Sequence, residues 1–503
     1  MIENKKVFLQ YLFSGFLIVL ASLIRWYYTG NLEADNNFIM NSNFGVYFYF
    51  ISYIVGFWFL VITYYRVITR KGGYDLSLSQ TRILSYLSFC LFYFMTVMFA
   101  SDIYTYLAEG ELATRGILTY TNGELVKQSN FEHYVSHWWK DCPNHYGPPL
   151  LLIFYISVSI GKSVTASYFV FKFLMLLVAF IFIEIIYRLF TQFQNESKYN
   201  LFALIILAPL FMIEGVGQTH VDLVITVLLA LSILFYLKEK KLIFLVWIAL
   251  AISCKIMYSM VLIPFVLALF YVEYVNKKKN ILQFFGYSFL AILFIYSIVA
   301  ITYISVWEGI ETITNPMAYH KNKTPSRSFT EIAILVYRFG GELLSNGFNI
   351  PQLLQDAHRP DFFPISKVLE YQKKVAPIFN ILGILLAAWN ALPLLKIKDS
   401  KKVFHIVAKI WMIIITVYSP IFNPWYFMPI LVLLFTSDTK SYVIYAVFVI
   451  SQSINGQLGN STIPPGHILE VFSSIQVLSM APLFLVYFRK HLIYETLDDI
   501  NQK

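Results

Sequence analysis

The first candidate catalytic residues stand in the segment SDIYTYLAEGELATRG, which begins at Ser101 directly after an apolar run. On a helix, Asp102, Tyr106 and Glu109 would occupy positions i, i+4 and i+7, which places the two carboxylates on one face, roughly 10 Å apart along the axis. A desolvated carboxylate beside aromatic rings has a raised pKa and can accept a proton from a hydroxyl nucleophile. In the structural alternative, Asp102 caps a helix, and Tyr104 and Tyr106 belong to an interfacial aromatic belt.

A second polar segment, EGVGQTHVDL, lies between two later apolar runs at residues 214–223. Its His220 and Asp222 stand where the chain re-enters the apolar phase. Polar side chains at membrane depth are costly unless they are paired or wetted, so two ionisable groups at this position favour a functional site. A hydrogen bond between His and Asp that only closes a helix hairpin is the alternative.

Two cations are candidates for binding an anionic group. Lys255 interrupts the apolar stretch ALAISCKIMYSMVLIPF, where it either extends to the nearer interface or meets an anion such as a lipid phosphate. Arg327 lies in the polar stretch 314–342, and its planar fork is suited to a phosphate. Lys321 and Lys323 in the same stretch are better explained as solvated loop charges.

Aromatic and metal-binding patterns are less specific. Trp425 and Tyr426, in YSPIFNPWYFMP, can stack on a sugar ring, although interfacial belts use the same residue types. The three cysteines form no CxxC pair and have no nearby His at ligand spacing, so we expect neither a zinc site nor a disulfide framework. A role for a divalent cation is open, because Asp102 and Glu109 are too far apart on a regular helix to chelate one ion directly.

The composition indicates the elements that must position these residues. Of the 503 residues, 58% are hydrophobic and only 13% are charged, and the mean hydropathy is +0.63. Runs of about 18 apolar residues, long enough to cross a hydrocarbon core of roughly 30 Å, recur along the chain. The predicted fold is an all-α polytopic transmembrane helix bundle of about 12 to 14 spans. The spans are expected at 7–24, 44–65, 83–100, 165–187, 200–217, 221–237, 242–254 with 256–272, 281–307, 375–395, 403–419, 426–437, 441–453 and 468–488.

The net charge of +9 does not indicate nucleic-acid binding, because the Lys and Arg residues form short clusters between apolar runs. All of these clusters fall on the cytoplasmic side if both termini are cytoplasmic and 148–163 is a short re-entrant or interfacial element. The N-terminal run is then an uncleaved first helix. This topology divides the chain into N-terminal helices at 1–100, a first long outer loop at 101–147, central helices at 148–307, a second long outer loop at 308–374 and C-terminal helices at 375–503.

The same topology places the candidate chemistry on the outer face of the cell membrane. The sequence has no GxxxxGK[ST] motif, no GxGxxG after a strand and no soluble stretch that could hold a nucleotide. A cytosolic nucleotide-sugar therefore has no binding place, whereas a lipid-linked group can be moved across the membrane.

Several motifs, taken in order, resemble the membrane glycosyltransferases of the GT-C superfamily, especially the polyprenol-phosphate-mannose-dependent mannosyltransferases. The family pattern D-x-Y-x-Y-x-x-D/E-G is matched at 102–110, and G-x-x-P-Y at 116–120 with Thr119 in place of the proline. The remaining elements are Y-G-P-L, G-H-x-D, A-x-x-x-K and P-W-Y. They are matched at 146–150 with an extra proline, at 219–222 with Thr219 in place of the glycine, at 251–255 and at 424–426.

The resemblance implies transfer of a sugar, mannose in this family, from a polyprenyl-phosphate carrier to a hydroxyl acceptor on a glycan or lipid, with inversion. The implied roles are general base for Asp102 and phosphate binding for Lys255 and Arg327. The resemblance further implies a supporting or acceptor role for Glu109, while His220 and Asp222 organise the sugar or phosphate. The implied substrate-binding aromatic residues are Tyr104, Tyr106, Tyr146, Trp425 and Tyr426.

Two other classes of protein compete with this interpretation. A transporter or flippase of a lipid-linked glycan would also need aromatic and cationic groups at the outer face, but it would need no base. Transporters usually place polar groups near the bilayer midplane on broken helices, whereas Lys172, Glu184 and Lys409 are scattered intramembrane charges without an evident pairing in the sequence. A structural scaffold would contain no perturbed acid.

Overall fold

A computed structural model of the chain describes nine stretches of the sequence. They are residues 2–29, 43–70, 76–96, 102–136, 139–193, 199–276, 280–321, 365–419 and 423–436. Arg327 and the predicted spans at 441–453 and 468–488 lie outside the described residues.

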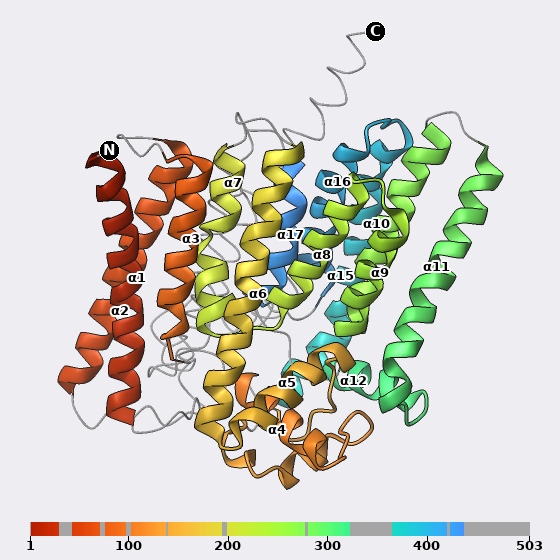
Figure 1. The fold of residues 1–503 in the computed structure, drawn as a ribbon. Coiled ribbons are helices and arrows are strands. Elements are labelled where there is room, and N and C mark those ends of the chain that lie inside the picture. The colour runs from red at the N-terminus through yellow and green to blue at the C-terminus, as the bar shows by residue number, and fades with distance from the viewer. Residues whose placement is uncertain are drawn as a thin grey trace, which may run out of the picture.

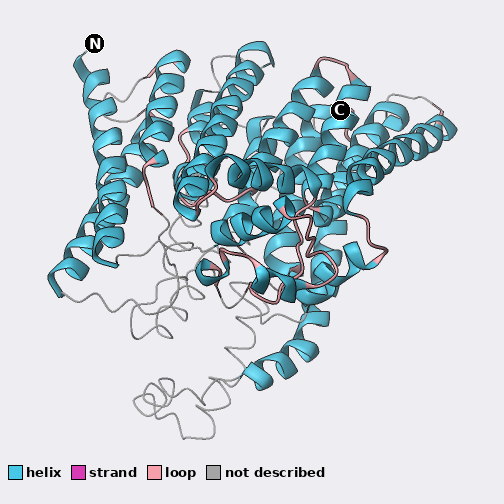
Figure 2. Cartoon of the chain, turned by 60° about the horizontal axis from the view of Figure 1, so that its bottom comes forward, coloured by secondary structure: helices cyan, strands magenta, loops and turns pink. Residues whose placement is uncertain are grey.

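The described residues form helices and loops, without a strand (Figures 1 and 2). The N-terminal half contains α1 (Ile2–Thr29), α2 (Asn43–Thr69), α3 (Leu78–Tyr93), α4 (Asp102–Thr114), α5 (Pro148–Gly161), α6 (Val164–Phe193), α7 (Tyr199–Ile206) and a π-helix (Phe211–Gly217). The later part contains α8 (Asp222–Leu237), α9 (Lys241–Cys254), α10 (Ser259–Tyr271), α11 (Ile281–Tyr303), α12 (Glu311–Lys321), α15 (Ile365–Ala391), α16 (Ser400–Ile413) and α17 (Met428–Leu433). Short 3-10 turns lie at 123–128, 132–134, 256–258, 304–306, 392–395, 424–427 and 434–436, and short π-helical turns at 272–276 and 414–418.

Seven described helical segments are long and apolar enough to cross a membrane, which confirms the prediction of an all-α polytopic bundle. They differ in how far the protein itself buries them. The segment Tyr199–Gly217 is 94% buried, whereas Lys373–Leu395 is only 11% buried. The first therefore lies inside the bundle, and the second presents a row of large apolar side chains outward, as a lipid-facing helix does.

The break at Lys255 was predicted correctly. Helix α9 ends at Cys254, Lys255 has an extended backbone, and α10 begins at Ser259 after a single 3-10 turn. The predicted span at 200–217 is not one regular helix, because α7 ends at Ile206 and the chain continues as the π-helix. The element expected near 148–163 is the short helix α5, with Pro148 at its first turn, where a missing backbone N–H costs nothing.

Helices α4, α5 and α12 lie at the end of the bundle opposite the N-terminus (Figure 1). Helix α4 packs against α5 so closely that a Cβ atom on Gly110 would come within 2.5 Å of the Phe154 carbonyl oxygen. It also contacts α6. Almost all of α4 is buried as a result, so the long loop expected at 101–147 begins with a covered helix and not with an exposed one.

Two of the intramembrane charges that lacked an evident partner in the sequence are paired in the structure. The Tyr86 hydroxyl donates to Glu184 at 2.7 Å, and the Arg82 guanidinium lies 3.3 Å from the same carboxylate. Lys172 also has partners, described below. These charges therefore join helices of the bundle.

The first prediction concerns orientation. Glu124 is exposed in the loop after α4, and we place that loop outside the cytoplasm because of the basic clusters at the opposite ends of the helices. A Glu124→Cys variant in which Cys142 has been replaced should react with a membrane-impermeant thiol reagent in intact cells. Labelling that appears only after lysis would show that the loop lies in the cytoplasm and that the orientation is the opposite one. The Cys142-free parent without the new cysteine is the control.

Candidate active site

Three buried ionisable side chains from distant parts of the chain meet at the start of α4. Asp102 is the first residue of α4, Glu214 lies in the π-helix, and His220 lies in the turn before α8. His220 Nδ1 is 3.6 Å from Asp102 Oδ2, and His220 Nε2 is 3.2 Å from Glu214 Oε2. We call these three residues the acid–histidine cluster.

The two contacts in this cluster lie within the distance of an ion pair, but their atoms are not aligned for a hydrogen bond. A protonated His220 would be attracted to carboxylates on both sides, and a neutral ring has one nitrogen that donates and one that accepts. A protonated imidazole at these distances would therefore stabilise negative charge on Asp102.

A strained turn brings His220 back towards Glu214. Thr219 has a φ of +61°, a left-handed conformation that is rare for a β-branched residue and costs of order 1 to 3 kcal/mol. The turn allows the His220 backbone N–H to donate to the Glu214 carbonyl oxygen at 2.9 Å. The family pattern G-H-x-D has glycine at this position, and glycine adopts the same backbone conformation without that cost.

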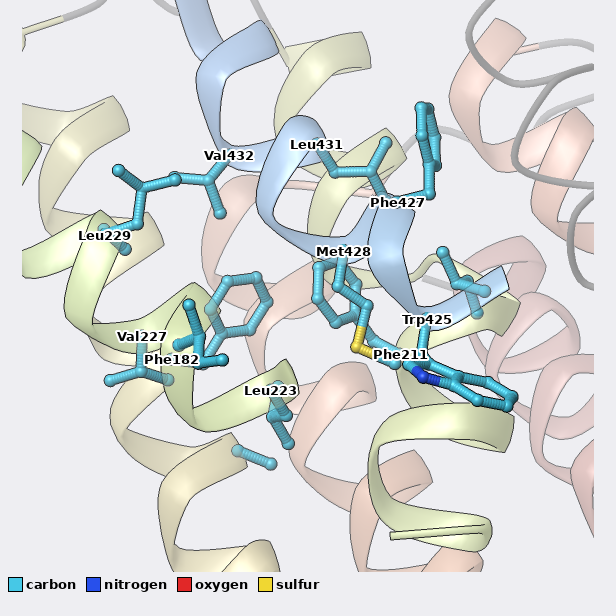
Figure 3. Packing of buried hydrophobic residues seen from close by; sticks show 14 of the residues in the cluster. Phe182, Phe211, Leu223, Val227, Leu229, Trp425, Phe427, Met428, Leu431 and Val432 are labelled. Atoms are coloured by element: carbon cyan, nitrogen blue, oxygen red, sulfur yellow. The ribbon is translucent and has the colours of Figure 1, made fainter. Parts of the chain in front are cut away.

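Trp425 covers one face of the imidazole. The rings of His220 and Trp425 are stacked, with centroids 3.5 Å apart and an interplanar angle of 13°. Figure 3 shows Trp425 at the edge of the buried apolar cluster that includes Phe211, Met428 and Leu223. This packing fixes the plane of the ring, so the directions of its two nitrogens are set by the core.

A second group of residues surrounds Lys255. Its ammonium lies 3.8 Å from Asp222 Oδ1, and the Tyr258 hydroxyl donates to the same oxygen at 2.5 Å. The ammonium also lies over the rings of Tyr426 and Tyr146, at 4.6 and 5.5 Å from their centroids. A buried cation with one carboxylate and two aromatic faces remains charged and can attract a further anion.

The loop that follows α4 is attached directly beside Lys255. The Gly147 backbone N–H donates to the Cys254 carbonyl oxygen at 2.8 Å, and a Cβ atom at Gly147 would lie 1.7 Å from the Ser253 carbonyl oxygen. Only glycine fits this approach. The contact places Tyr146 over Lys255, and Tyr146 in turn donates a hydrogen bond to Tyr106 of α4 at 3.4 Å.

Glu109 contacts a different part of the loop that follows α4. The Thr119 hydroxyl donates to a carboxylate oxygen of Glu109. Burial raises the pKa of Glu109 to about 8, although the hydrogen bond from Thr119 acts in the opposite direction. At neutral pH most of the Glu109 carboxyl therefore carries a proton.

The remaining predicted residues lie in different surroundings. Tyr104 packs between Tyr134 and Tyr168, with centroid distances of 5.8 and 6.2 Å, on the side of α4 that meets α6. Arg327 is not among the described residues. Within the described stretches, no three His, Cys, Asp or Glu side chains are arranged to hold a metal ion, and a role for a divalent cation stays a prediction.

Sequence reasoning missed two partners at this site. Glu214 appeared only as the start of a polar segment, and Tyr258 had no role. A regular helix through Glu214 gives no reason to expect its side chain at His220, because the contact depends on the π-helix and the strained turn. The spacing of Asp222 and Tyr258 likewise gives no sign that they meet, since they belong to different helices.

The fold and the site define a multi-pass membrane protein with a buried acid–histidine cluster and a buried cation at one end of its bundle. Residues 12–272, just over half of the chain, match the family described as "Alpha-(1->6)-mannopyranosyltransferase, N-terminal domain". The chain belongs to this family. The match confirms the resemblance to membrane mannosyltransferases that the motifs indicated, and it favours an enzyme over a transporter.

A curated relative gives a second comparison. The chain is 28% identical over 174 residues to alpha-(1->6)-mannopyranosyltransferase A of Corynebacterium glutamicum. The aligned region covers 34% of this chain and 35% of the relative, so the chain matches about a third of the relative's length. No solved structure matches the chain.

Proposed function

We propose that this protein transfers a mannosyl group from a polyprenyl-phosphate carrier to a hydroxyl group of a glycan or lipid acceptor. The observation that carries the proposal is that Asp102 lies beside His220, while Asp222, two residues after His220, lies beside the buried cation Lys255. The family supports mannose as the sugar. The name of the relative further supports an α-(1→6) linkage in the product.

In the proposed reaction, Asp102 accepts the proton of the acceptor hydroxyl. The hydroxyl oxygen then forms a bond to the anomeric carbon while the bond from that carbon to the phosphate oxygen breaks. The electron pair of the broken bond leaves with the lipid phosphate, whose negative charge Lys255 stabilises. A single displacement of this kind inverts the configuration at the anomeric carbon.

The surroundings of the two acids support Asp102 as the base. Asp102 faces His220, which can stabilise the carboxylate before the reaction and take part in removing the proton afterwards. Glu109 is mostly protonated at neutral pH because burial raises its pKa to about 8. A carboxyl group that already carries a proton cannot accept one, so Glu109 is better suited to orienting the loop or the acceptor.

The donor is proposed to be lipid-linked because α4, which begins with Asp102, lies at the end of the bundle away from the N-terminus (Figure 1). We place that end on the outer face of the membrane, with both termini cytoplasmic. There the site is separated from cytosolic nucleotide-sugars. The apolar outer faces of the helices offer a surface for a polyprenyl chain, whose phosphate would reach Lys255 from the membrane interface.

Replacement of Lys255 tests the phosphate-binding role. Lys255→Met keeps most of the apolar stem and removes the charge, so binding of a polyprenyl-phosphate sugar should weaken roughly 5- to 100-fold, the equivalent of about 1 to 3 kcal/mol for a charge-assisted contact. Donor titration of the purified variant measures the change. Lys238→Met, at an exposed position at the opposite end of α8, should bind the donor normally. Unchanged affinity in the Lys255 variant would mean that this cation has no part in donor binding.

Replacement of Asp102 tests the base. Asp102→Asn keeps the shape of the side chain but cannot take a proton near neutral pH, so transfer should fall roughly 100-fold or more while donor binding is retained. Initial rates and donor titration on the same preparation separate the two effects. Glu111→Gln is the matched control, because Glu111 is a buried acid of the same helix that bonds to Asn130 and Arg115, outside the acid–histidine cluster. Transfer within a few-fold of wild type in Asp102→Asn would contradict the assignment.

A further inference from the structure

Lys172 is a fully buried lysine of α6 that takes no direct part in either group of site residues. Its ammonium donates to three backbone carbonyl oxygens: Met95 at 2.6 Å, Gly217 at 2.8 Å and Val216 at 3.1 Å. An ammonium has three N–H donors, so these three bonds use all of them.

The three carbonyl groups belong to the ends of two separate elements. Met95 follows the C-terminal end of α3, and Val216 and Gly217 are the last residues of the π-helix. Carbonyl oxygens at a helix C-terminus lack partners within the helix and carry partial negative charge, which a cation stabilises. Lys172 therefore joins two helix ends that repel one another electrostatically. The join is tight, because a Cβ atom on Gly217 would lie 2.5 Å from Met95 Sδ.

Each joined end leads into the acid–histidine cluster. Met95 lies seven residues before Asp102 in the sequence, and Val216 and Gly217 lie between Glu214 and His220. The α3 end is also fixed to α1, since the Thr96 hydroxyl donates to the Ser22 carbonyl oxygen at 2.8 Å. The position of the His220 turn relative to this fixed end thus depends on the Lys172 bonds.

The same face of α6 also contacts the helix that carries Asp102. Tyr168, one turn before Lys172, stacks against Tyr104, and Phe171 packs against Tyr106 with ring centroids 5.7 Å apart. One helix therefore contacts α4 through its aromatic rings and the π-helix through its ammonium. An apolar side chain at position 172 would avoid the cost of burying a cation, but it would leave the helix ends without a shared partner.

We propose that Lys172 is a positioning residue that sets the distance between Asp102 and His220. The proposal rests on the proposed role of Asp102 as the base. Lys172 touches no substrate; it acts by holding the segment that carries His220 against the end of α3 while α6 holds α4. Its contribution is to the transfer step and not to donor binding, which the Lys255 group performs.

The test compares Lys172→Met with Lys172→Gln. The methionine has no donor and should lower the rate constant for transfer about 10- to 100-fold, while the dissociation constant for the polyprenyl-phosphate donor stays within about three-fold of wild type. The glutamine keeps two N–H donors and should recover part of the lost rate. Glu184→Gln is the control on the same helix, because it alters a half-buried charge of α6 that joins α3 away from the site; its rate should stay within about two-fold.

A double variant distinguishes positioning from general stabilisation. If Lys172 acts through the Asp102–His220 pair, Lys172→Met in the Asp102→Asn background should lower the remaining rate by less than about three-fold, because the pair is already inactive. A structural role predicts the same loss in both backgrounds, and that result would overturn the proposal. So would a wild-type rate in Lys172→Met, or failure of both the Met and the Gln variants to give folded protein. An active Asp102→Asn single variant would instead overturn Asp102 as the base. Failure of the proposed base is thus distinguished from failure of the proposed role of Lys172.

Discussion

His220 makes the interaction on which the rest of the site depends. Its two ring nitrogens face carboxylates from different parts of the sequence, Asp102 and Glu214, and all three side chains are buried. Charges cannot remain in such surroundings without partners, because the loss of hydration costs several kcal/mol per ion. The imidazole lies between the two acids, and it thereby links the start of α4 to the π-helix. The π-helix and the strained Thr219 turn aim the ring, and Trp425 fixes its plane.

The same requirement applies to three other charged groups in the described part of the bundle. Lys255 lies near Asp222 and two tyrosine rings, Glu184 accepts from Tyr86, and the ammonium of Lys172 is surrounded by carbonyl oxygens. These pairings differ in their consequence. Glu184 joins helices away from the site, whereas the Lys255 and Lys172 contacts bring together segments that carry the proposed catalytic and binding groups. Burial thus serves two purposes here, since it holds the helices in place and strengthens electrostatic interactions where charge would develop during transfer.

The sequence predicted the parts of this arrangement that depend on local pattern. Apolar runs predicted the helices, and the lone Lys255 predicted the break between α9 and α10. Asp102 and His220 were each candidates because they are ionisable residues next to apolar runs, and the structure brings the two together. Contacts that depend on irregular backbone could not be predicted in this way. Glu214 reaches His220 only through a π-helix and a left-handed threonine, and Lys172 reaches three carbonyl groups that no side-chain pattern reveals. The segment from Asp102 to Glu109 is helical, as predicted. The contact of Glu109 with Thr119 could not be predicted, because it depends on how the loop after α4 folds back.

The central claim is that the sugar arrives on a polyprenyl phosphate and leaves by transfer to a hydroxyl group. Incubation of the purified full chain with polyprenyl-phosphate mannose and a short mannose oligosaccharide measures this most directly, by release of free polyprenyl phosphate together with a lengthened oligosaccharide. We expect release of one polyprenyl phosphate for each mannose transferred, and no transfer when a nucleotide-linked mannose is the only donor. Transfer from the nucleotide-linked sugar, without any from the lipid-linked one, would contradict it.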